Sequence, residues 1–314
     1  MSANSSMLTR RSLRRGFTLI EILVSLAILG IIGLAFVRLL TSQARFTEGQ
    51  MALRNARSVS RNAMNIMLTD IRMVQDSGGL RAASRDSVTV RVPVAFGLLC
   101  ANTGGLATMQ LVPVDSAMTA LGQYAGWAYR DSVDGVYKYQ DAVTPVSIAS
   151  LPSGTTTTCT DSTIVFGVQR PGIVPMSYTT STGAVRTSRV IQLSDPIVAA
   201  APNAGWPVFL YQLVTYQFAG SNAYPGRIGL FRKVRQAGVN PIVDEIIAPF
   251  DTSAKIRFYV LNSDVSQALP PADLNTVRGL ELVLAGSSPR AEQGKKAALD
   301  GLVTGVFFKN RRDP

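Results

Sequence analysis

The chain is 314 residues long and 46% hydrophobic, so it can bury a sizeable core, and its net charge is +11. It contains no histidine, which excludes Ser-His-Asp and Cys-His catalysis and any metal site with a histidine ligand. Its two cysteines are too few for a cysteine-only structural zinc site within one chain. Because no other catalytic constellation stands out, we expect no enzyme, no cofactor and no bound metal.

The first predicted segments are a basic leader, residues 1–16, and an apolar helix, residues 17–40. The leader holds four arginines and no acid, and the run Phe17–Leu40 would form a helix of roughly 36 Å, long enough to cross a bilayer. Because basic residues favour the cytoplasmic side, the rest of the chain is predicted to lie outside the cytoplasm. No Ala-x-Ala-like cleavage site follows the run, so we expect the apolar segment to be retained.

One acidic residue, Glu21, lies inside this apolar run. An ionised carboxylate in a spanning helix costs about 2.5–3.5 kcal/mol on insertion scales, so it needs a partner. Thr18, Glu21 and Ser25 share one polar stripe, because their spacing places them on one side of a helix. Taken alone, Glu21 is also compatible with an acid tolerated near the membrane edge.

The residues Arg14–Glu21, which read RRGFTLIE, resemble the processing site of type IV prepilins and pseudopilins. The resemblance implies that a prepilin peptidase cleaves after Gly16 and that the new N-terminal residue, Phe17, is N-methylated. Glu21 matches the glutamate that this family carries near its mature N-terminus. In a filament of staggered helices, the Phe17 ammonium of one subunit would meet the Glu21 carboxylate of its neighbour. A buried charge is tolerated when it is paired, so Glu21 is expected to set the assembly register.

The helix departs from the family pattern in lacking a proline. Major pilins commonly kink it at the position that Arg38 occupies here, whereas this sequence has no proline between Phe17 and Val92. Gly30 and Gly33 are expected to soften the helix instead. This departure favours a minor pilin or a pseudopilin.

Residues 41–77 are predicted to continue the same helix as an amphipathic half. Apolar residues recur there at three- and four-residue steps, and Arg54, Arg57 and Arg61 fill the other face. The glycines Gly78 and Gly79 would end the helix. The alternative is two helices broken near Gly49.

Residues 78–314 are predicted to form a β-rich head, with period-two patterns that indicate an antiparallel sheet covered by the amphipathic helix. The expected fold class is therefore α+β, of the type IV pilin-like kind. The predicted strands are Ser87–Phe96, Thr163–Val168, Arg189–Leu193, Val208–Phe218, Ile228–Arg235, Lys255–Leu261, Val277–Leu284 and Leu302–Phe308.

The stretch 101–160 is rich in small and polar residues and is interpreted as an insertion in the head. Cys100 and Cys159 bracket it and are predicted to form a disulfide, because the head is expected outside the cytoplasm. Such a bond would contribute roughly 4 kcal/mol in the chain-entropy model. The alternative is two unpaired buried thiols.

Two charged clusters carry weaker signals. Asp131 and Asp134 precede Gly135, but without the spacing of an EF-hand we interpret them as a turn rather than a calcium site. Arg232, Lys233 and Arg235 have aromatic neighbours, as nucleic-acid surfaces do, although a solvated strand edge is the favoured interpretation. Asp244, Glu245 and Asp251 are interpreted as solvated loop charges.

The C-terminal half resembles PilW-type minor pilins and the J-type minor pseudopilin of type II secretion. The similarity lies in Leu213–Phe218, Gly229–Arg232, Arg257–Val260, Val277–Ala285 and Val306–Arg311. It implies a minor pilin that enters, or primes assembly of, a type IV pilus. A type II secretion pseudopilin is one alternative, and a filament-tip adhesin or DNA-binding subunit is another.

The resemblance also implies partners and a location. The partners would be other minor pilins, the major pilin, the inner-membrane assembly platform and the prepilin peptidase, while nucleic acid is disfavoured but left open. The chain would first be a single-pass inner-membrane protein with its head outside the cytoplasm, and later part of a pilus or pseudopilus filament.

Overall fold

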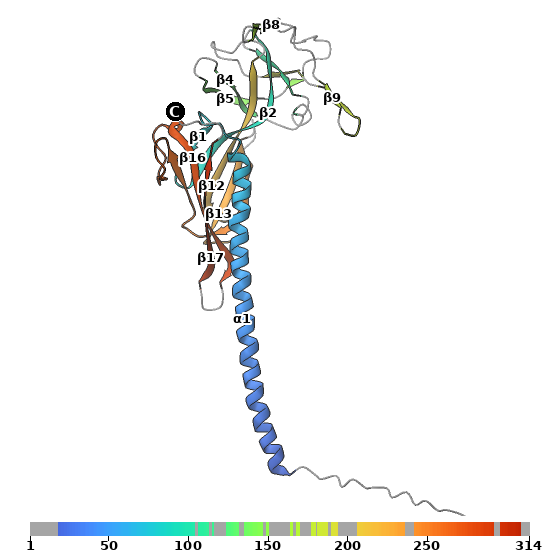
Figure 1. Ribbon diagram of the computed structural model, residues 1–314, viewed down its shortest axis with the longest axis vertical. Coiled ribbons are helices and arrows are strands. Elements are labelled where there is room, and N and C mark those ends of the chain that lie inside the picture. Colours follow the sequence, from blue (N-terminus) through green and yellow to red (C-terminus); the bar gives the residue numbers. More distant parts are fainter. Residues whose placement is uncertain are drawn as a thin grey trace, which may run out of the picture. The chain divides into compact units, whose positions relative to one another are not determined.

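The structure is a computed structural model (Figure 1). It describes residues 18–103, 106–112, 115, 124–131, 135–146, 149–150, 164–165, 168–169, 177–179, 181–187, 190–193, 206–235, 242–291 and 296–308. The chain divides into two compact units, of which the first ends at Met51 and the second begins at Ala52.

Among the described residues, the helices and strands in chain order are α1 (Leu19–Ile71), β1 (Leu80–Ala83), β2 (Ser87–Thr103), β3 (Leu106–Leu111), β4 (Tyr124–Arg130), β5 (Tyr137–Val146), β6 (Ala149–Ser150), β7 (Ile164–Val165), β8 (Val168–Gln169), β9 (Ser177–Thr179), β10 (Val185–Thr187), β11 (Val190–Leu193), β12 (Pro207–Gly220), β13 (Ile228–Arg235), β14 (Ile242–Phe250), β15 (Lys255–Val260), the 3₁₀ turn η2 (Leu274–Thr276), β16 (Val277–Ala291) and β17 (Ala297–Phe307).

Helix α1 runs without interruption from Leu19 to Ile71, so the alternative of a break near Gly49 is wrong. No proline interrupts this stretch, and an α-helix tolerates its glycines at a modest cost. At its end the backbone tightens, because the amides of Met73 and Val74 bond the carbonyls of Asp70 and Ile71, each at 3.1 Å. Gly78 then takes a φ of 72°, which a residue without a side chain adopts readily.

The strands form an antiparallel sheet of 13 strands, which confirms the α+β fold predicted from the sequence. Its main order is β15-β16-β14-β13-β12-β2-β3-β11-β6. Four further strands join this path, since β1 pairs with β2, β17 with β16, β4 with β12 and β5 with β4. The hairpins β7-β8 and β9-β10 each form a separate two-stranded sheet.

Most strands predicted in the C-terminal half agree with the structure, and β13 has the predicted bounds. The single strand predicted at Thr163–Val168 is wrong, because β7 and β8 form a two-stranded hairpin there. Asp244 and Glu245 are not loop residues, because both lie within β14. Strands β3, β4 and β5 lie within residues 101–160, and β4 adds to the main sheet along β12.

The main core lies between the helix and the sheet. The residues Ala56, Ser60, Ala63, Met67 and Ile71 form the buried stripe of α1, at helical spacing. This stripe packs against β2, β12, β15, β16 and β17, whose inward side chains include Val90, Tyr216, Phe258, Leu282 and Val306. In Figure 1 this part of α1 lies along the strands labelled β12, β13 and β17.

A close backbone approach fixes where the helix meets the sheet. The Ser60 hydroxyl lies 3.1 Å from the carbonyl of Asp300 and 3.3 Å from that of Leu284, and it accepts a bond from the Gly286 amide at 2.9 Å. A Cβ on Gly286 would lie 2.2 Å from the carbonyl oxygen of Ala56, so any side chain there would push the helix away. Glycine is therefore required at this contact.

A second core lies on the far stretches of β2 and β12. Leu99, Met109, Trp127 and Leu210 are buried there, from β2, β3, β4 and β12. Strand β12 changes its neighbour along its length, pairing with β4 through Tyr211 and with β13 from Leu213 onward. The two long strands β2 and β12 thus carry both cores.

Candidate functional site

The described chain begins at the N-terminus of α1, where Thr18 caps the helix. Its backbone amide and hydroxyl lie 2.9 and 3.1 Å from Oε2 of Glu21, and its Oγ1 accepts a bond from the Glu21 amide at 3.3 Å. This reciprocal arrangement is a capping box, which satisfies backbone amides that a helix end leaves free. The predicted cleavage residues Gly16 and Phe17 lie outside the described residues, so their roles stay predictions.

The carboxylate of Glu21 is exposed at this end of the helix. All three capping contacts use Oε2 or the Glu21 amide, and Oε1 accepts no hydrogen bond from the residues that the structure describes. One carboxylate oxygen is therefore open to a cation from outside the chain.

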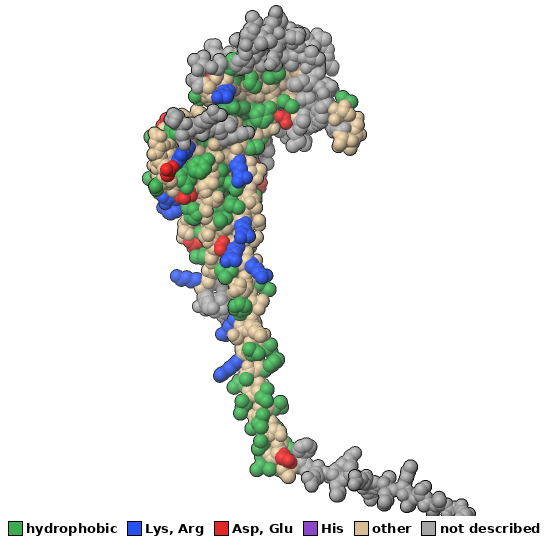
Figure 2. All heavy atoms as spheres, viewed as in Figure 1, with side chains coloured by type: hydrophobic (Ala, Val, Ile, Leu, Met, Phe, Trp, Pro, Cys, Tyr) green, Lys and Arg blue, Asp and Glu red, His purple; other side chains and the backbone are tan. Residues whose placement is uncertain are grey.

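Around and beyond Glu21 the helix exposes large apolar side chains. Leu19, Leu26 and Ile31 are 78%, 65% and 71% exposed, and Figure 2 shows hydrophobic side chains covering this first part of α1. Helix α1 is long and apolar enough to cross a membrane. A helix that is apolar all round is stable when it is surrounded by lipid or by other helices.

A second cluster lies in the head, beside a third group of buried side chains that includes Phe209, Tyr211 and Leu213. Arg91 and Asp141 form a two-point ion pair, with Nη2–Oδ2 and Nε–Oδ1 distances of 2.7 and 2.9 Å. The Tyr211 hydroxyl donates to the same carboxylate at 2.6 Å, and Arg81 adds a contact of 2.8 Å. The guanidinium of Arg91 also lies 4.7 Å from the ring centre of Tyr139.

The electrostatics of this cluster favour a charged Asp141. Burial alone would raise the pKa of its carboxyl, but the hydrogen bonds from Arg91 and Tyr211 and the charges of Arg91 and Arg81 outweigh burial and lower it. Burial raises the pKa of Tyr211, and the bond to Asp141 raises it further, so the hydroxyl stays protonated. The cluster joins β2, β5 and β12 as a structural clamp.

We expect Asp141→Asn to lower the free energy of unfolding by about 2 kcal/mol at pH 7, because Arg91 would lose its charged partner in a half-buried position. Because folding lowers the pKa of Asp141, its carboxylate stabilises the fold at pH values above its unfolded-state pKa of about 3.9. This stabilisation is lost as the pH falls through the folded-state pKa. The difference in the free energy of unfolding between variant and wild type should therefore persist down to about pH 5 and become smaller below pH 4.

The measurement is denaturant unfolding of the purified full chain in detergent between pH 3 and 8. Asp244→Asn is the matched control, because this carboxylate is exposed on β14, and we expect it to change stability by less than about 0.5 kcal/mol. A pH-independent gap for Asp141→Asn would contradict the role given to its charge.

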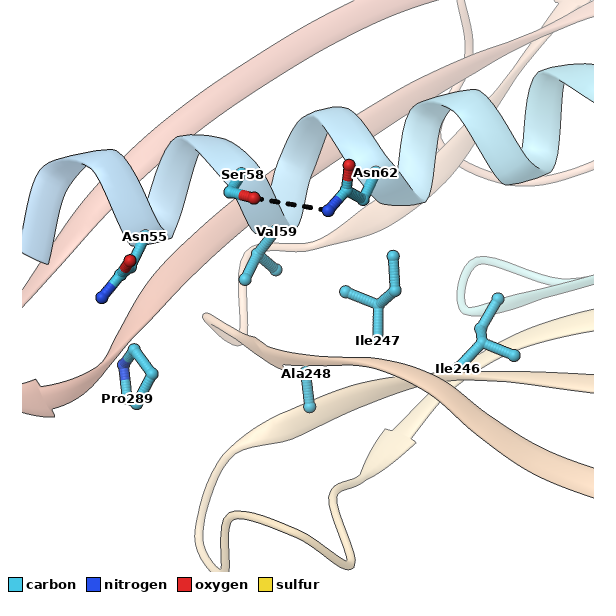
Figure 3. Close-up of a pocket in the computed structure, with 8 residues that line it drawn as sticks. All are labelled: Asn55, Ser58, Val59, Asn62, Ile246, Ile247, Ala248 and Pro289. Atoms are coloured by element: carbon cyan, nitrogen blue, oxygen red, sulfur yellow. Dashed lines mark hydrogen bonds between the residues drawn. The ribbon is translucent and has the colours of Figure 1, made fainter.

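A shallow groove of about 440 Å³ runs between α1 and β14 (Figure 3). Its helix side is polar, and Asn62 donates a hydrogen bond of 3.3 Å to Ser58. Its strand side is apolar, with Ile246, Ile247 and Ala248 from β14. Ionisable side chains are absent from the groove's described lining.

The other charged residues noted in the sequence form contacts within the fold. Arg232 pairs with Asp70 of α1 at 3.0 Å and so ties β13 to the helix. Glu245 is not a solvated loop charge, because its Oε2 accepts the amides of Asn222 and Ala223 at 2.8 and 3.2 Å, which closes the turn after β12. The backbone carbonyl of Asp131 accepts the Gly135 amide at 3.1 Å, Asp134 lies outside the described residues, and no metal-binding cluster lies among those described.

The predicted disulfide has one half in β2, since Cys100 belongs to that strand, whereas Cys159 lies outside the described residues. The bond between them stays a prediction. The sequence did not single out Asp141, Arg91 and Tyr211. Strand periodicity gave no signal for Arg91, because it alternates with the core residue Val90 and so takes the opposite face of β2.

The comparisons with known proteins concern the N-terminus. Residues 11–37 match the family model described as the prokaryotic N-terminal methylation motif. The chain matches no curated protein and no solved structure. The motif is the signal of type IV prepilin-like proteins, and together with the apolar helix and the antiparallel sheet it supports a membrane-anchored, type IV pilin-like protein.

Proposed function

We propose that this chain is a minor pilin, which a prepilin peptidase cleaves between Gly16 and Phe17 and which then enters, or primes assembly of, a type IV pilus. The observation that carries the proposal is the methylation motif at residues 11–37, at the head of an apolar helix whose one acid in its spanning part is Glu21. Cleavage would remove the basic leader and leave an amine on Phe17.

The assembly chemistry follows from the open oxygen of Glu21. In a bundle of staggered helices, the methylated ammonium of Phe17 from one subunit would face the Glu21 carboxylate of its neighbour. A wrong stagger would leave two charges unpaired in an apolar environment, which costs several kcal/mol. The capping bonds from Thr18 engage Oε2 of this carboxylate and leave Oε1 open to the ammonium of the neighbouring subunit.

The subtype is supported by the helix and by the C-terminal half. A helix without proline from Leu19 to Ile71 and the resemblance of the late strands to PilW-type proteins favour a minor subunit. The partners would be the major pilin, other minor pilins, the prepilin peptidase and the inner-membrane assembly platform. The head would lie outside the cytoplasm before and after assembly.

The same two features also fit a minor pseudopilin of type II secretion. Deleting the gene separates the two functions. We expect fewer pili in the sheared surface fraction, unchanged secretion of folded enzymes, and restoration by the wild-type chain. Lost secretion with normal pili would favour the pseudopilin, and no change in either would contradict the proposal.

A further inference from the structure

Strand β17 forms one edge of the sheet. It pairs with β16 over most of its length, and none of the described residues pairs with its other side. Natural proteins protect such an edge with charges, prolines, bulges or a covering segment, because its free amides and carbonyls otherwise attract another strand. Apart from Asp300, β17 contains no charged residue and no proline.

The outward face of β17 is apolar. Leu299, Val303 and Phe307 are 51%, 59% and 54% exposed, whereas the alternate residues Leu302 and Val306 face the main core. A strand with one face in water normally alternates apolar-in with polar-out. The Phe307 ring lies 5.1 Å from that of Tyr259, so the apolar strip continues onto β15.

A basic flank of α1 borders this edge. Arg57 reaches Asp300 of β17 at 3.2 Å, which places this side of the helix directly beside the strand. Arg54 and Arg61 are exposed and lie three and four residues from Arg57, on the same flank. Neither forms an ion pair with any residue that the structure describes, and Figure 2 shows basic side chains gathered along this part of the molecule.

We propose that this edge, made of β17 and the flank Arg54–Arg61, binds a different protein subunit that adds an apolar strand to β17 and places carboxylates opposite Arg54 and Arg61. Strand addition would satisfy the free backbone groups of β17 and cover Leu299, Val303 and Phe307. The inference rests on the proposed function only because it requires this chain to have neighbouring subunits. The surface involved lies in the head and does not include Glu21.

Charge excludes a second copy as the occupant. Without the four arginines of its leader the chain still carries a net charge of +7, and two copies of this surface would set one arginine flank against another. The only acid on β17, Asp300, is already paired with Arg57. The occupant must therefore bring the carboxylates that this chain lacks at its edge.

The first test places a photoreactive amino acid at position 303 of the full chain in its native cells, with position 243 on β14 as the control. Val243 is also apolar and 46% exposed, but it lies on a different strand. We expect a light-dependent adduct at 303 to a different extracytoplasmic subunit, cross-linked within a strand that is flanked by Asp or Glu. An adduct of two copies, an adduct to lipid, or no adduct would overturn the proposal.

The second test reverses charge. Arg54→Glu with Arg61→Glu should lower the yield of the 303 adduct roughly tenfold, which corresponds to the loss of two exposed ion pairs and their replacement by repulsion. Replacing the facing Asp or Glu residues of the identified subunit with lysine should restore the yield of the 303 adduct. Arg72→Glu is the control, since Arg72 is exposed beyond the end of α1 and should leave the yield unchanged. An unchanged yield in the double variant would overturn the proposal.

Processing is followed in the same cells, by the mass of the mature chain. A chain that is cut and assembled normally, yet forms no adduct at 303, refutes the binding edge and leaves the proposed function intact. An uncut chain in wild-type cells refutes the proposed function instead, whatever adduct is formed.

Discussion

Gly16→Val is expected to abolish processing and to leave a precursor that is heavier by the mass of residues 1–16. The residue before the predicted cut is glycine, and a β-branched side chain would crowd the backbone where the peptidase must approach. The retained leader keeps its arginines at the cytoplasmic face, so the precursor should stay in the membrane fraction and be missing from sheared filaments. Immunoblotting of the two fractions and the intact mass of the chain provide the measurement.

Gly30→Val is the matched control for this substitution. Gly30 lies inside the apolar helix, and a Cβ there would have no atom within 4 Å. This variant should be cut normally, since valine in a spanning helix adds only apolar surface. If Gly16→Val were also cut normally, the cleavage site would lie elsewhere in the chain.

Helix α1 could be predicted from the sequence because its determinants are local. The apolar run, the amphipathic pattern that follows it and the absence of proline all act within a few residues, and they specify a continuous helix. The strands β12, β13, β15 and β16 were predicted for a similar reason, since their side chains alternate between the core and the outer face.

The rest of the head depends on contacts between distant segments. Strand β14 carries Asp244 and Glu245 in its middle, which favours a loop until the turn after β12 supplies two amides to Glu245. Arg91, Asp141 and Tyr211 come from three strands that meet only in the folded sheet. No local pattern contains such a cluster, because strand pairing and not spacing along the chain brings its members together.

The free edge of β17 also depends on strand pairing, which the local sequence does not reveal. Its apolar pattern predicted a strand correctly, but a pattern alone does not reveal whether the strand lies in the middle of a sheet or at its edge. Residues such as Val303 and Phe307 would be ordinary core residues in a central strand. They are exposed because the sheet ends there, and it is this exposure that supports the binding role proposed for them.

Glu21→Ala is expected to be cleaved and inserted into the membrane normally but to enter filaments roughly a hundredfold less than the wild type. Without the carboxylate, the Phe17 ammonium of the neighbouring subunit would be left unpaired among apolar helices, which costs about 3 kcal/mol or more. The measurement is the amount of mature chain in sheared filaments relative to that in the membrane fraction.

Alanine at position 21 removes the helix cap as well as the charge, so two further variants separate these roles. Glu21→Gln keeps an oxygen that can accept the Thr18 amide and hydroxyl, but it carries no charge. Thr18→Ala removes the hydroxyl and leaves the carboxylate ionised. If charge pairing sets the register, Glu21→Gln should assemble as poorly as Glu21→Ala, while Thr18→Ala should assemble nearly as well as the wild type. The opposite pattern would show that Glu21 works as a helix cap and that the register is set elsewhere along α1.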